Sequence, residues 1–437
     1  MDHRPIQRRQ FVKQSAVLAA AASAFPAGVQ GQSAESEKIK VALIGCGGRG
    51  TGAAAQALAA DDQTELFAMA DISREQLDLS RETLKKNAKP EQVTVSPENE
   101  FVGLEAYQRV MDLGDVDVVI LTTPPGFRPF HFEAAVRAGK HVFMEKPVAV
   151  DAVGIRRVLE AAKQAKAKGL KVGVGLNRRH SPVHREVVSR IHDGAIGEIP
   201  MIQMLNCRGD VNKRKTRVEG QSELEFQIKN WYYFTWLSGD FMVEQSVHEF
   251  DVVRWVKDEA FPVSCQGQGG RTVRNGPADG HIYDHYSVDY EFADGSSVLT
   301  QHRQIPKVWS WFGQKIMGTK GSAELSFKMN GSVKPTGEGA QAWRGRETGN
   351  SYQLEHDALF AAIREGTEFN EAERGAYSTL FALMGRMAAY TGKVVTWDEA
   401  LNSDEEIAFN PTSFDEEARF FPDENGIYET FRPGVTG

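Results

Sequence analysis

The first half of the chain alternates short apolar runs with amphipathic segments. Continuous apolar runs of four to eight residues predict strands buried on both faces, and a 3.6-residue period predicts helices. The predicted strands cover residues 39–44, 64–70, 116–122, 141–144 and 171–176, and the predicted helices cover 51–60, 129–138 and 152–168. Repeated strand–helix units with short connections predict a parallel, doubly wound α/β sheet of the Rossmann type.

The pattern changes after about residue 180. Strict alternation of apolar and polar positions predicts strands, and two of them are joined by a hairpin turn at 293–296. The predicted strands cover residues 201–207, 287–292, 297–302 and 314–318, and the predicted helices cover 182–193, 354–364 and 372–390. We therefore expect a second α/β domain built on a large, mostly antiparallel, open sheet.

These patterns divide the 437 residues, which are too many for one ordinary core, into four parts. We predict a signal peptide over 1–34, a dinucleotide-binding domain over 38–176, a substrate-binding and oligomerisation domain over 177–402 and a surface tail over 403–437. The paired Arg8 and Arg9, followed by the apolar stretch 16–25 and by small residues, indicate a signal peptide that resembles the twin-arginine type. The alternative is a disordered, mildly basic tail. The first interpretation implies the twin-arginine export machinery as a partner and a periplasmic or otherwise exported location.

The composition of the chain argues against several classes of protein and kinds of site. The net charge of −8 argues against a general nucleic-acid binder, and no other apolar run is long enough for stable membrane insertion. The basic cluster 213–217 is followed by acidic residues and is interpreted as a solvated loop instead of a phosphate-binding patch. The three cysteines have neither metal-ligand nor disulfide-framework spacing.

The chemistry begins in the loop after the first strand. Gly45, Gly47 and Gly50 form G-x-G-x-x-G between a strand and a helix, which is the dinucleotide-binding fingerprint in its required context. Gly45 is expected to make the tight turn, Gly47 to let the backbone approach a pyrophosphate, and Gly50 to let the helix pack on the strand. The helix N-terminus then faces the phosphates.

Asp71 ends the second strand, 21 residues after Gly50. A carboxylate at this place accepts hydrogen bonds from a ribose 2′-hydroxyl and repels a 2′-phosphate, which favours NAD over NADP. Arg74 lies close in sequence and leaves NADP open as the less favoured cofactor.

Two further sets of residues could carry out catalysis. Lys146, in the run Glu145-Lys146-Pro147, follows a parallel strand at its carboxyl end, where ligands bind in open α/β sheets. Glu244 and His248 are four residues apart on a predicted helix and share a face, so the carboxylate could orient the imidazole as an acid/base pair. Asp251 is also within reach of His248. A surface lysine, a helix-surface ion pair and a zinc site at His248 are the alternatives, although no second histidine has ligand spacing and we expect no metal.

Together these motifs resemble the Gfo/Idh/MocA family, which includes glucose–fructose oxidoreductase and inositol dehydrogenase. The glycine loop, the turn 122–124, the run 145–147 and the helix carrying His248 occur in family order over about residues 38–400. The resemblance implies hydride transfer between a nicotinamide and a sugar or cyclitol carbon, with Lys146 catalytic or substrate-positioning and His248 the acid/base. It also implies an open sheet that often mediates homo-oligomers. The chain departs from the family in having Glu244 where aspartate is common.

The resemblance assigns further residues. The expected cofactor contacts are Gly45, Gly47, Gly48, Arg49, Gly50, Asp71, Arg74, Thr122, Pro124, Glu145 and Lys146. The expected substrate contacts are Asn177 and Arg178, which follow a sheet strand where the family places such contacts. Trp231 and Tyr233 are added because aromatic faces pack on sugars; the alternative is that they are core or subunit-interface aromatics. Arg179, His285 and Arg303 are weaker candidates.

Three functions are compatible with these residues. The first is an NAD(P)-dependent oxidoreductase that acts on a sugar or cyclitol with a tightly bound cofactor, inserted before export. The second is a redox-neutral, NAD-dependent glycoside hydrolase that resembles α-N-acetylgalactosaminidase. The third is an inactive sugar-binding module, which the presence of Lys146, Glu244 and His248 disfavours.

Overall fold

The computed structural model of the chain describes residues 38–435, apart from residues 212 and 327. The predicted twin-arginine segment, 1–34, therefore lies outside the described residues. Within the described part of the chain, no helix is both long and apolar enough to cross a membrane.

The first sheet is entirely parallel and has the strand order β3-β2-β1-β4-β5-β6, with the reversal of strand order beside β1. Its strands are β1 (Ile39–Ile44), β2 (Thr64–Asp71), β3 (Glu100–Val102), β4 (Val118–Leu121), β5 (His141–Met144) and β6 (Val172–Val174). The predicted parallel, doubly wound sheet is confirmed. The short strand β3 was not predicted.

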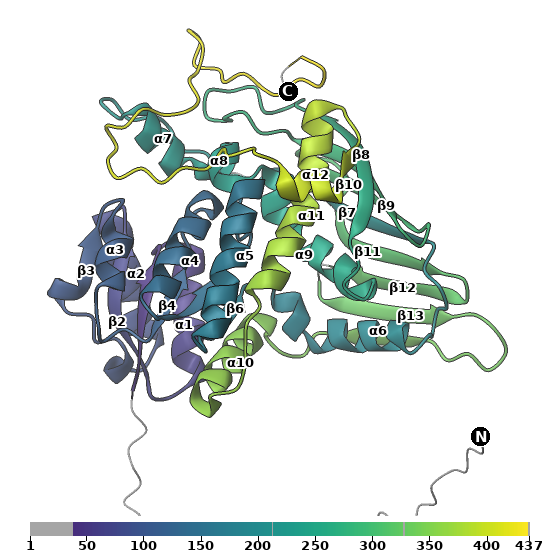
Figure 1. The fold of residues 1–437 in the computed structure, drawn as a ribbon, viewed down its shortest axis with the longest axis horizontal. Helices are drawn as coiled ribbons and strands as arrows, with labels where there is room; N and C mark the ends of the chain where they lie inside the picture. The colour runs from purple at the N-terminus through teal and green to yellow at the C-terminus, as the bar shows by residue number, and fades with distance from the viewer. Residues whose placement is uncertain (1–37, 212, 327, 436–437) are drawn as a thin grey trace, which may run out of the picture. The chain divides into compact units, whose positions relative to one another are not determined.

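Helices cover both faces of this sheet (Figure 1). They are α1 (Gly48–Ala60), α2 (Arg74–Asn87), α3 (Ala106–Met111), α4 (Arg128–Arg137) and α5 (Ala152–Ala167). The predicted start of the first helix at residue 51 is too late, because Gly48, Arg49 and Gly50 already belong to the helix. The side chains of Ser73 and Asp151 cap the first turns of α2 and α5.

The second sheet has the order β14-β13-β12-β11-β7-β10-β9-β8-β15 and is antiparallel except for the pair β7 and β10. Its strands are β7 (Met201–Arg208), β8 (Pro262–Gly270), β9 (His285–Phe292), β10 (Ser297–Gln304), β11 (Trp311–Gly318), β12 (Gly321–Ser326), β13 (Asn330–Pro335), β14 (Trp343–Arg346) and β15 (Val395–Thr396). The predicted open, mostly antiparallel sheet is confirmed. The strands β8, β12, β13, β14 and β15 were not predicted.

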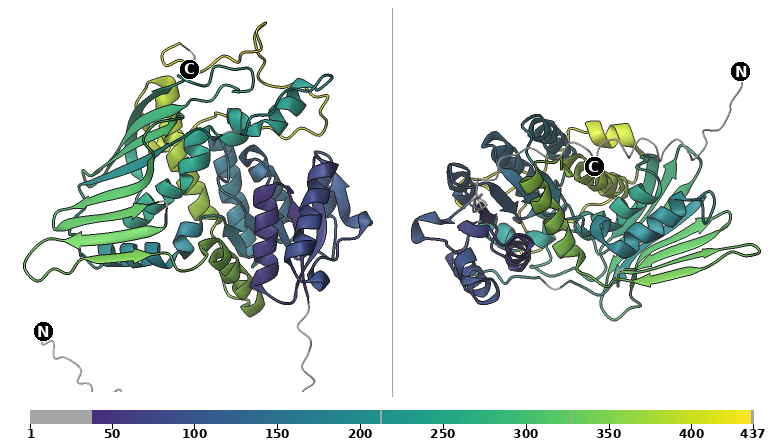
Figure 2. Two further views of the ribbon diagram at one scale, coloured as in Figure 1. Left: turned by 180° about the vertical axis from the view of Figure 1, so that it is seen from behind. Right: turned by 90° about the horizontal axis from the view of Figure 1, so that it is seen from below.

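Helices of the second half pack between the two sheets and along their edges. They are α6 (Pro182–His192), α7 (Glu223–Lys229), α8 (Thr235–Ser238), α9 (Phe241–Val256), α10 (Ser351–Glu365), α11 (Ala372–Thr391) and α12 (Trp397–Asn402). Helix α11 packs on α5 from the first sheet and on α9 and β8 from the second, and Figures 1 and 2 show it running between the two layers. This packing fixes how the carboxyl ends of the first sheet face α9.

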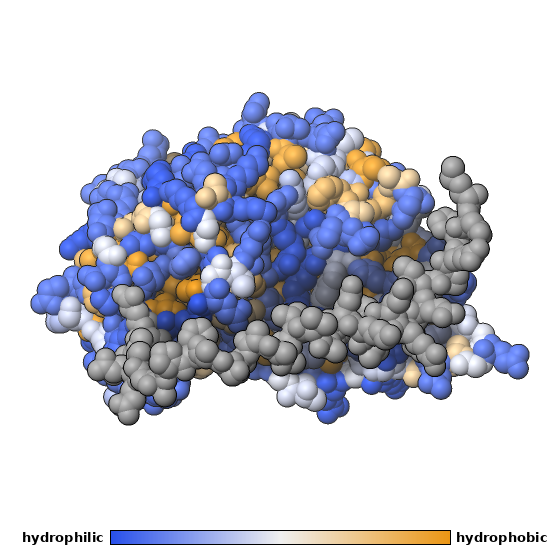
Figure 3. Space-filling model, turned by 60° about the horizontal axis from the view of Figure 1, so that its bottom comes forward, coloured by the Kyte–Doolittle hydropathy of each residue, from blue (hydrophilic) through white to orange (hydrophobic). Residues whose placement is uncertain are grey.

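The molecular surface is mainly hydrophilic in the view of Figure 3, with smaller hydrophobic areas between the polar ones. On the second sheet, Val263, Leu299 and Met317 are exposed. The predicted use of this sheet in a homo-oligomer stays a prediction.

Candidate functional site

The loop between β1 and α1 has the geometry that its three glycines predict. Gly45 has φ of +96°, and a Cβ atom there would lie 2.8 Å from the backbone nitrogen of Thr123. A Cβ atom on Gly50 would lie 1.9 Å from the Gly45 carbonyl oxygen, so only glycine lets the helix approach the strand. A Cβ atom on Gly47 would meet nothing within 4 Å, because this residue borders open space.

The open space beside Gly47 is suited to an anionic group. Gly47 is the N-cap of α1 and contributes no side-chain hydrogen bond, so the N–H groups of the first turn keep their donor capacity. A cavity of about 580 Å³, which we call the Gly-loop cavity, is lined by Gly45, Gly47 and Asp71. These features fit a dinucleotide whose pyrophosphate lies at the helix N-terminus.

Asp71 lies at the end of β2 beside the loop, as predicted. Its Oδ2 atom accepts a hydrogen bond of 2.6 Å from the Cys46 N–H, and its Oδ1 atom accepts one of 2.9 Å from the Ser73 N–H. Burial raises the pKa of Asp71. Each carboxylate oxygen keeps a further lone pair toward the cavity.

Arg74 does not line either cavity of the site. Its guanidinium lies 2.5 Å from the Glu100 carboxylate and 3.7 Å from that of Asp78. The structure therefore does not place Arg74 with the other predicted cofactor residues, because its side chain pairs with Glu100 on β3.

A second cavity of about 880 Å³, which we call the α9 cavity, opens from the first. The two share Gly47, Thr122, Thr123, Pro124, Lys215, Lys229 and Trp231. The predicted residues that line the α9 cavity are Gly47, Gly48, Arg49, Gly50, Thr122, Pro124, Glu145, Lys146, Asn177, Arg178, Trp231, Glu244 and His248. Most predicted cofactor, catalytic and substrate residues thus meet around two adjoining spaces.

Lys146 and Glu244 form the central ion pair of the α9 cavity. The Lys146 ammonium donates to the Glu244 carbonyl oxygen at 2.6 Å and to its Oε1 atom at 3.3 Å. Burial alone would raise the pKa of Glu244, but the cations of Lys146 and Lys213 hold it below its ordinary value. The predicted contact between Glu244 and His248 is wrong. The longer glutamate arm reaches the lysine that follows β5, so Glu244 positions Lys146.

His248 lies one helical turn after Glu244 and lines the same cavity. Its Nδ1 atom is buried and has no hydrogen-bond partner among the described residues. Burial, and then the positive charges of Lys146 and Arg178, hold the pKa of His248 well below its ordinary value. The imidazole is therefore neutral at neutral pH and can accept a proton.

Arg49 lies at the edge of the α9 cavity, between Glu145 and helix α10. It is hydrogen-bonded to Glu145, lies 3.3 Å from the Glu355 carboxylate and stacks over the Tyr352 ring with its guanidinium carbon 4.8 Å from the ring centroid. Burial and the neighbouring Glu145 raise the pKa of Glu355 well above its ordinary value. Glu355 and Tyr352 belong to α10, and no local sequence signal points to them.

The predicted substrate contacts are correct in part. Asn177, Arg178 and Trp231 line the α9 cavity, and Asn177 donates a hydrogen bond of 2.8 Å to Ser351. Tyr233 does not line it, because its hydroxyl donates to the Val211 carbonyl oxygen at 2.7 Å. The neighbouring Tyr232 lines the cavity instead, since the 3₁₀ turn Trp231–Tyr233 directs adjacent rings to different sides.

Sequence reasoning missed several residues of the α9 cavity. Asn206 and Arg208 are two residues apart on β7 and therefore share a face of the sheet, a signal that the alternating pattern contains. Lys213 and Lys215, interpreted as part of a solvated loop, are exposed but line the cavity. The remaining missed residues of this lining include Arg128, Lys229, Asn230, Gln245, Phe312, Met329 and Tyr352.

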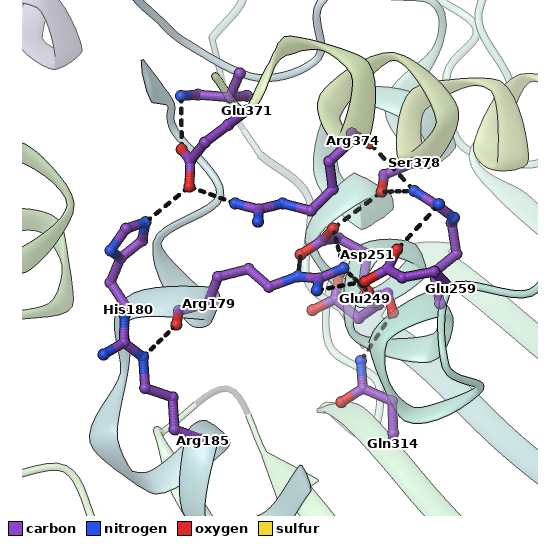
Figure 4. A network of polar contacts seen from close by, with 12 residues as sticks. Arg179, His180, Arg185, Glu249, Asp251, Glu259, Gln314, Glu371, Arg374 and Ser378 are labelled. Carbon is purple, nitrogen blue, oxygen red and sulfur yellow. Dashed lines mark hydrogen bonds and ion pairs between the residues drawn. The ribbon is translucent and has the colours of Figure 1, made fainter. Parts of the chain in front are cut away.

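Arg179 and Asp251 belong to a separate buried ion network behind the cavity (Figure 4). Arg179 contacts the two Asp251 carboxylate oxygens at 2.8 and 2.9 Å, and Ser378 donates to Asp251 at 2.9 Å. The predicted approach of Asp251 to His248 is therefore wrong. His285 and Arg303 border another hollow on the second sheet, so they do not reach the α9 cavity.

The chain after α12 and the loop before α7 close over the Gly-loop cavity. Asn410 and Pro411 line it, and the Asn410 amide donates to the Tyr107 hydroxyl at 2.9 Å. Ser222 donates to the Phe414 carbonyl oxygen at 2.7 Å, which ties the loop to the tail. Figure 1 shows the tail running along the same side of the molecule as α7 and α8. We call the residues 215–221 and 409–414 the strap.

The described residues contain no group of three or more metal-ligating side chains arranged to hold a metal ion. Cys46, Cys207 and Cys265 are free and buried. Burial raises the pKa of the Cys46 thiol well above its ordinary value, so this residue of the glycine loop is an inert small side chain.

Comparison with known proteins agrees with this geometry. Residues 39–175 match the sequence profile described as the oxidoreductase family with an NAD-binding Rossmann fold, Gfo/Idh/MocA. An inositol 2-dehydrogenase of Rhizobium meliloti is 28% identical over 263 residues, which cover 58% of this chain and 72% of the relative.

Two solved structures share the fold over both domains. The aldose–aldose oxidoreductase of Caulobacter crescentus, complexed with glycerol, superposes with a TM-score of 0.65 at 18% identity and covers 82% of this chain and 100% of its own. A levoglucosan dehydrogenase in complex with NADH and levoglucosan superposes with a TM-score of 0.66 at 16% identity and covers 82% and 99%. Residues 39–175 are thus similar to the NAD-binding Rossmann domain of the Gfo/Idh/MocA oxidoreductase family.

Proposed function

We propose that the chain is an NAD-dependent oxidoreductase that moves a hydride between a retained nicotinamide and a hydroxyl-bearing carbon of a sugar or cyclitol. The observation that carries this proposal is the meeting of the Gly-loop cavity with the α9 cavity at Lys146 and His248. Relatives named for inositol, aldose and levoglucosan chemistry support the substrate class.

Lys146 and His248 supply the proton chemistry. An ammonium has three N–H donors, and Lys146 directs two of them at Glu244, so one remains for a substrate hydroxyl. The neutral imidazole of His248 takes the hydroxyl proton as the adjacent C–H bond breaks. A nicotinamide dinucleotide held by the glycine loop and Asp71 would supply the acceptor for the hydride, which carries both electrons of that bond. The products are a carbonyl compound, the reduced cofactor and a proton.

Asp71 and Arg74 favour NAD over NADP. The Asp71 carboxylate borders the cavity next to the glycine loop, whereas Arg74 is occupied by Glu100. A 2′-phosphate would therefore meet a carboxylate without a facing guanidinium.

The strap supports slow cofactor exchange. It lines the Gly-loop cavity from two distant segments of the chain, and its outer end is anchored where Phe409 stacks on Trp236 with ring centroids 4.5 Å apart. A nucleotide in this cavity would contact the strap, and we expect these contacts to slow its release. We further propose that the chain is exported by the twin-arginine route with its nucleotide already bound, since Arg8 and Arg9 precede a short apolar stretch.

The test begins with the purified, exported protein. Mass spectrometry of the small molecules released on denaturation should identify NAD(H); release of NADP(H), or of no nucleotide, would contradict the cofactor proposal. The native protein is then mixed with sugars and cyclitols while the absorbance of bound NADH is followed. Reduction should be lost in His248→Asn and kept in His192→Asn, which changes an exposed histidine outside both cavities.

The same experiment separates the alternative chemistry. Release of the aglycone from a chromogenic glycoside without net NADH would support the redox-neutral hydrolase. Binding of sugars without any change in cofactor redox state would support an inactive binding module.

A further inference from the structure

The positive charges around the α9 cavity exceed the carboxylates available to pair with them. Four cations that line it have counter-charges: Arg49 with Glu145, Lys146 with Glu244, Arg178 with Glu249 and Lys229 with Glu225. Arg128, Arg208, Lys213 and Lys215 also line the cavity, and no ion pair of any of them is found among the described residues. Of these, Arg208 and Lys213 lie at the end formed by β7 and the loop after it.

Arg208 is held in place without being neutralised. Its guanidinium carbon lies 5.4 Å from the centroid of the Phe312 ring, and its Nε atom is buried without a hydrogen-bond partner. On the same face of β7, Asn206 donates to Ser246 at 2.9 Å while its Oδ1 atom is buried and unpartnered. Buried polar groups in native proteins normally have partners, so these atoms point to a ligand.

Lys213 extends the positive region toward the catalytic ion pair. Its ammonium lies 5.0 Å from the centroid of the Trp231 ring and 5.2 Å from that of Tyr232. Its backbone N–H donates to the Tyr233 hydroxyl at 3.1 Å, which fixes the loop. Lys215 lines both cavities and is therefore closer to the cofactor side.

Arg208 and Lys213 have no ion-pair partner, and the charge of Lys213 acts only from a distance on Glu244, which Lys146 already pairs. An anionic group would reduce the repulsion between Arg208 and Lys213, whereas a neutral sugar would not. A carboxylate or phosphate is such a group, and Arg208 offers the planar fork that binds these groups in a bidentate manner. Binding of the cofactor phosphates does not account for Arg208 and Lys213, because neither residue lines the Gly-loop cavity.

We propose that the substrate is an anionic sugar or cyclitol derivative whose oxyanion binds between Arg208 and Lys213, while a hydroxyl of its ring meets Lys146 and His248. This inference rests on the proposed function. The oxyanion is the carboxylate of a sugar acid or the phosphate of a sugar phosphate, and Asn206 Oδ1 accepts a hydrogen bond from a hydroxyl of the same molecule.

The test compares matched neutral and anionic compounds: glucose, glucuronate and glucose 6-phosphate, and the galactose and inositol counterparts. The kcat/KM for the better anionic member should exceed that of its neutral counterpart by about 10- to 100-fold, the value of a hydrogen-bonded charge pair. If the enzyme prefers the carboxylate compound, the substrate is a sugar acid; if it prefers the phosphate compound, the substrate is a sugar phosphate. In Arg208→Gln and Lys213→Met, the ratio of kcat/KM for the anionic compound to that for the neutral compound should fall by at least about tenfold. The control Lys393→Met changes an exposed lysine outside both cavities and should leave the ratio unchanged.

The inference would be overturned if the kcat/KM for the neutral compounds equalled or exceeded that for the anionic ones. It would also be overturned if the variants lost the same factor in kcat/KM for neutral and anionic compounds. Should no compound reduce the bound nucleotide, the proposed function fails separately. Calorimetric binding of the same compounds to the wild type and to Arg208→Lys and Arg208→Gln then still decides whether the cavity selects anions.

Discussion

Two groups of charged side chains lie along helix α9, and they differ in whether they pair with one another away from the cavities or line the α9 cavity. At the C-terminal turns, the network of Figure 4 gives each carboxylate a cation: Asp251 and Glu259 contact Arg179, and Glu371 contacts Arg374. At the N-terminal turns, Lys146 and Glu244 pair, but His248 Nδ1, Arg208 Nε and Asn206 Oδ1 are buried without partners.

The difference indicates what each group does. The ion pairs of the first group stabilise one arrangement of α9 against α11, and Arg179, Asp251 and Glu371 line neither cavity. An incomplete network keeps donors and acceptors aimed at a cavity, where a substrate completes them. Substitutions in the first should therefore change stability, and substitutions in the second should change turnover.

The largest expected effect is on turnover. Lys146→Met should lower kcat by about 10²- to 10⁴-fold, because it removes the donor to the substrate hydroxyl. Steady-state kinetics, with mass spectrometry of the bound nucleotide, check that cofactor retention is unchanged. The single substitution leaves Glu244 buried without its cation. The double variant Lys146→Met/Glu244→Gln should therefore be as inactive as Lys146→Met but more stable to unfolding. Wild-type rates in either variant would remove Lys146 from the mechanism.

Arg179→Met should act on stability instead. Breaking a buried ion pair by removing one partner costs about 3–5 kcal/mol, because Asp251 would remain charged and unpaired. Thermal or urea unfolding measures this loss, and Arg344→Met, which changes an exposed arginine, serves as the control. At low temperature, where the variant is folded, its kcat should stay close to that of the wild type. A large fall in kcat there would mean that the two groups are one functional unit.

The pH dependence of stability should show the contribution of Glu371. Burial would raise its pKa, but Arg374 and His180 hold the pKa of Glu371 at about 2, below the ordinary value of 4.5. The stabilisation is therefore complete above pH 4.5 and is lost as the pH falls toward 2; its size is roughly 3 kcal/mol. Unfolding of Glu371→Gln at several pH values should show a difference from the wild type that narrows in acid. A constant difference would contradict the assignment.

The smallest expected effect concerns His248. Since its pKa is held well below 6.5, the imidazole stays unprotonated when the pH falls from 8 to 6.5. The kcat/KM for oxidation should change less than about twofold over this range, with the acidic limb of the profile at lower pH. A half-maximal rate at pH 6.5 would show instead that the catalytic base has an ordinary imidazole pKa.

Adjacent residues show how far sequence reasoning reaches. Arg178 and Arg179 are consecutive, yet the first lines the α9 cavity and the second is bound to Asp251. Tyr232 and Tyr233 divide in the same way. The side that each residue faces depends on short 3₁₀ turns, for which the chain has no periodic signal.

The sequence by itself determined the parallel sheet, the open second sheet, the glycine loop with Asp71, and the places of Lys146 and His248. These features follow from local patterns: strand periodicity, the conformations that only glycine allows, and the position of ligands at the carboxyl ends of parallel strands.

Tertiary structure alone decided which side chains form ion pairs and which line the cavities. It paired Glu244 with Lys146 across 98 residues of chain, turned Arg74 toward Glu100, and placed Arg208 of β7 beside the cavity. Ion pairs and cavity linings are set by the packing of α9 and β7 against the first sheet, because electrostatic contacts depend on distance in space and not on spacing along the chain.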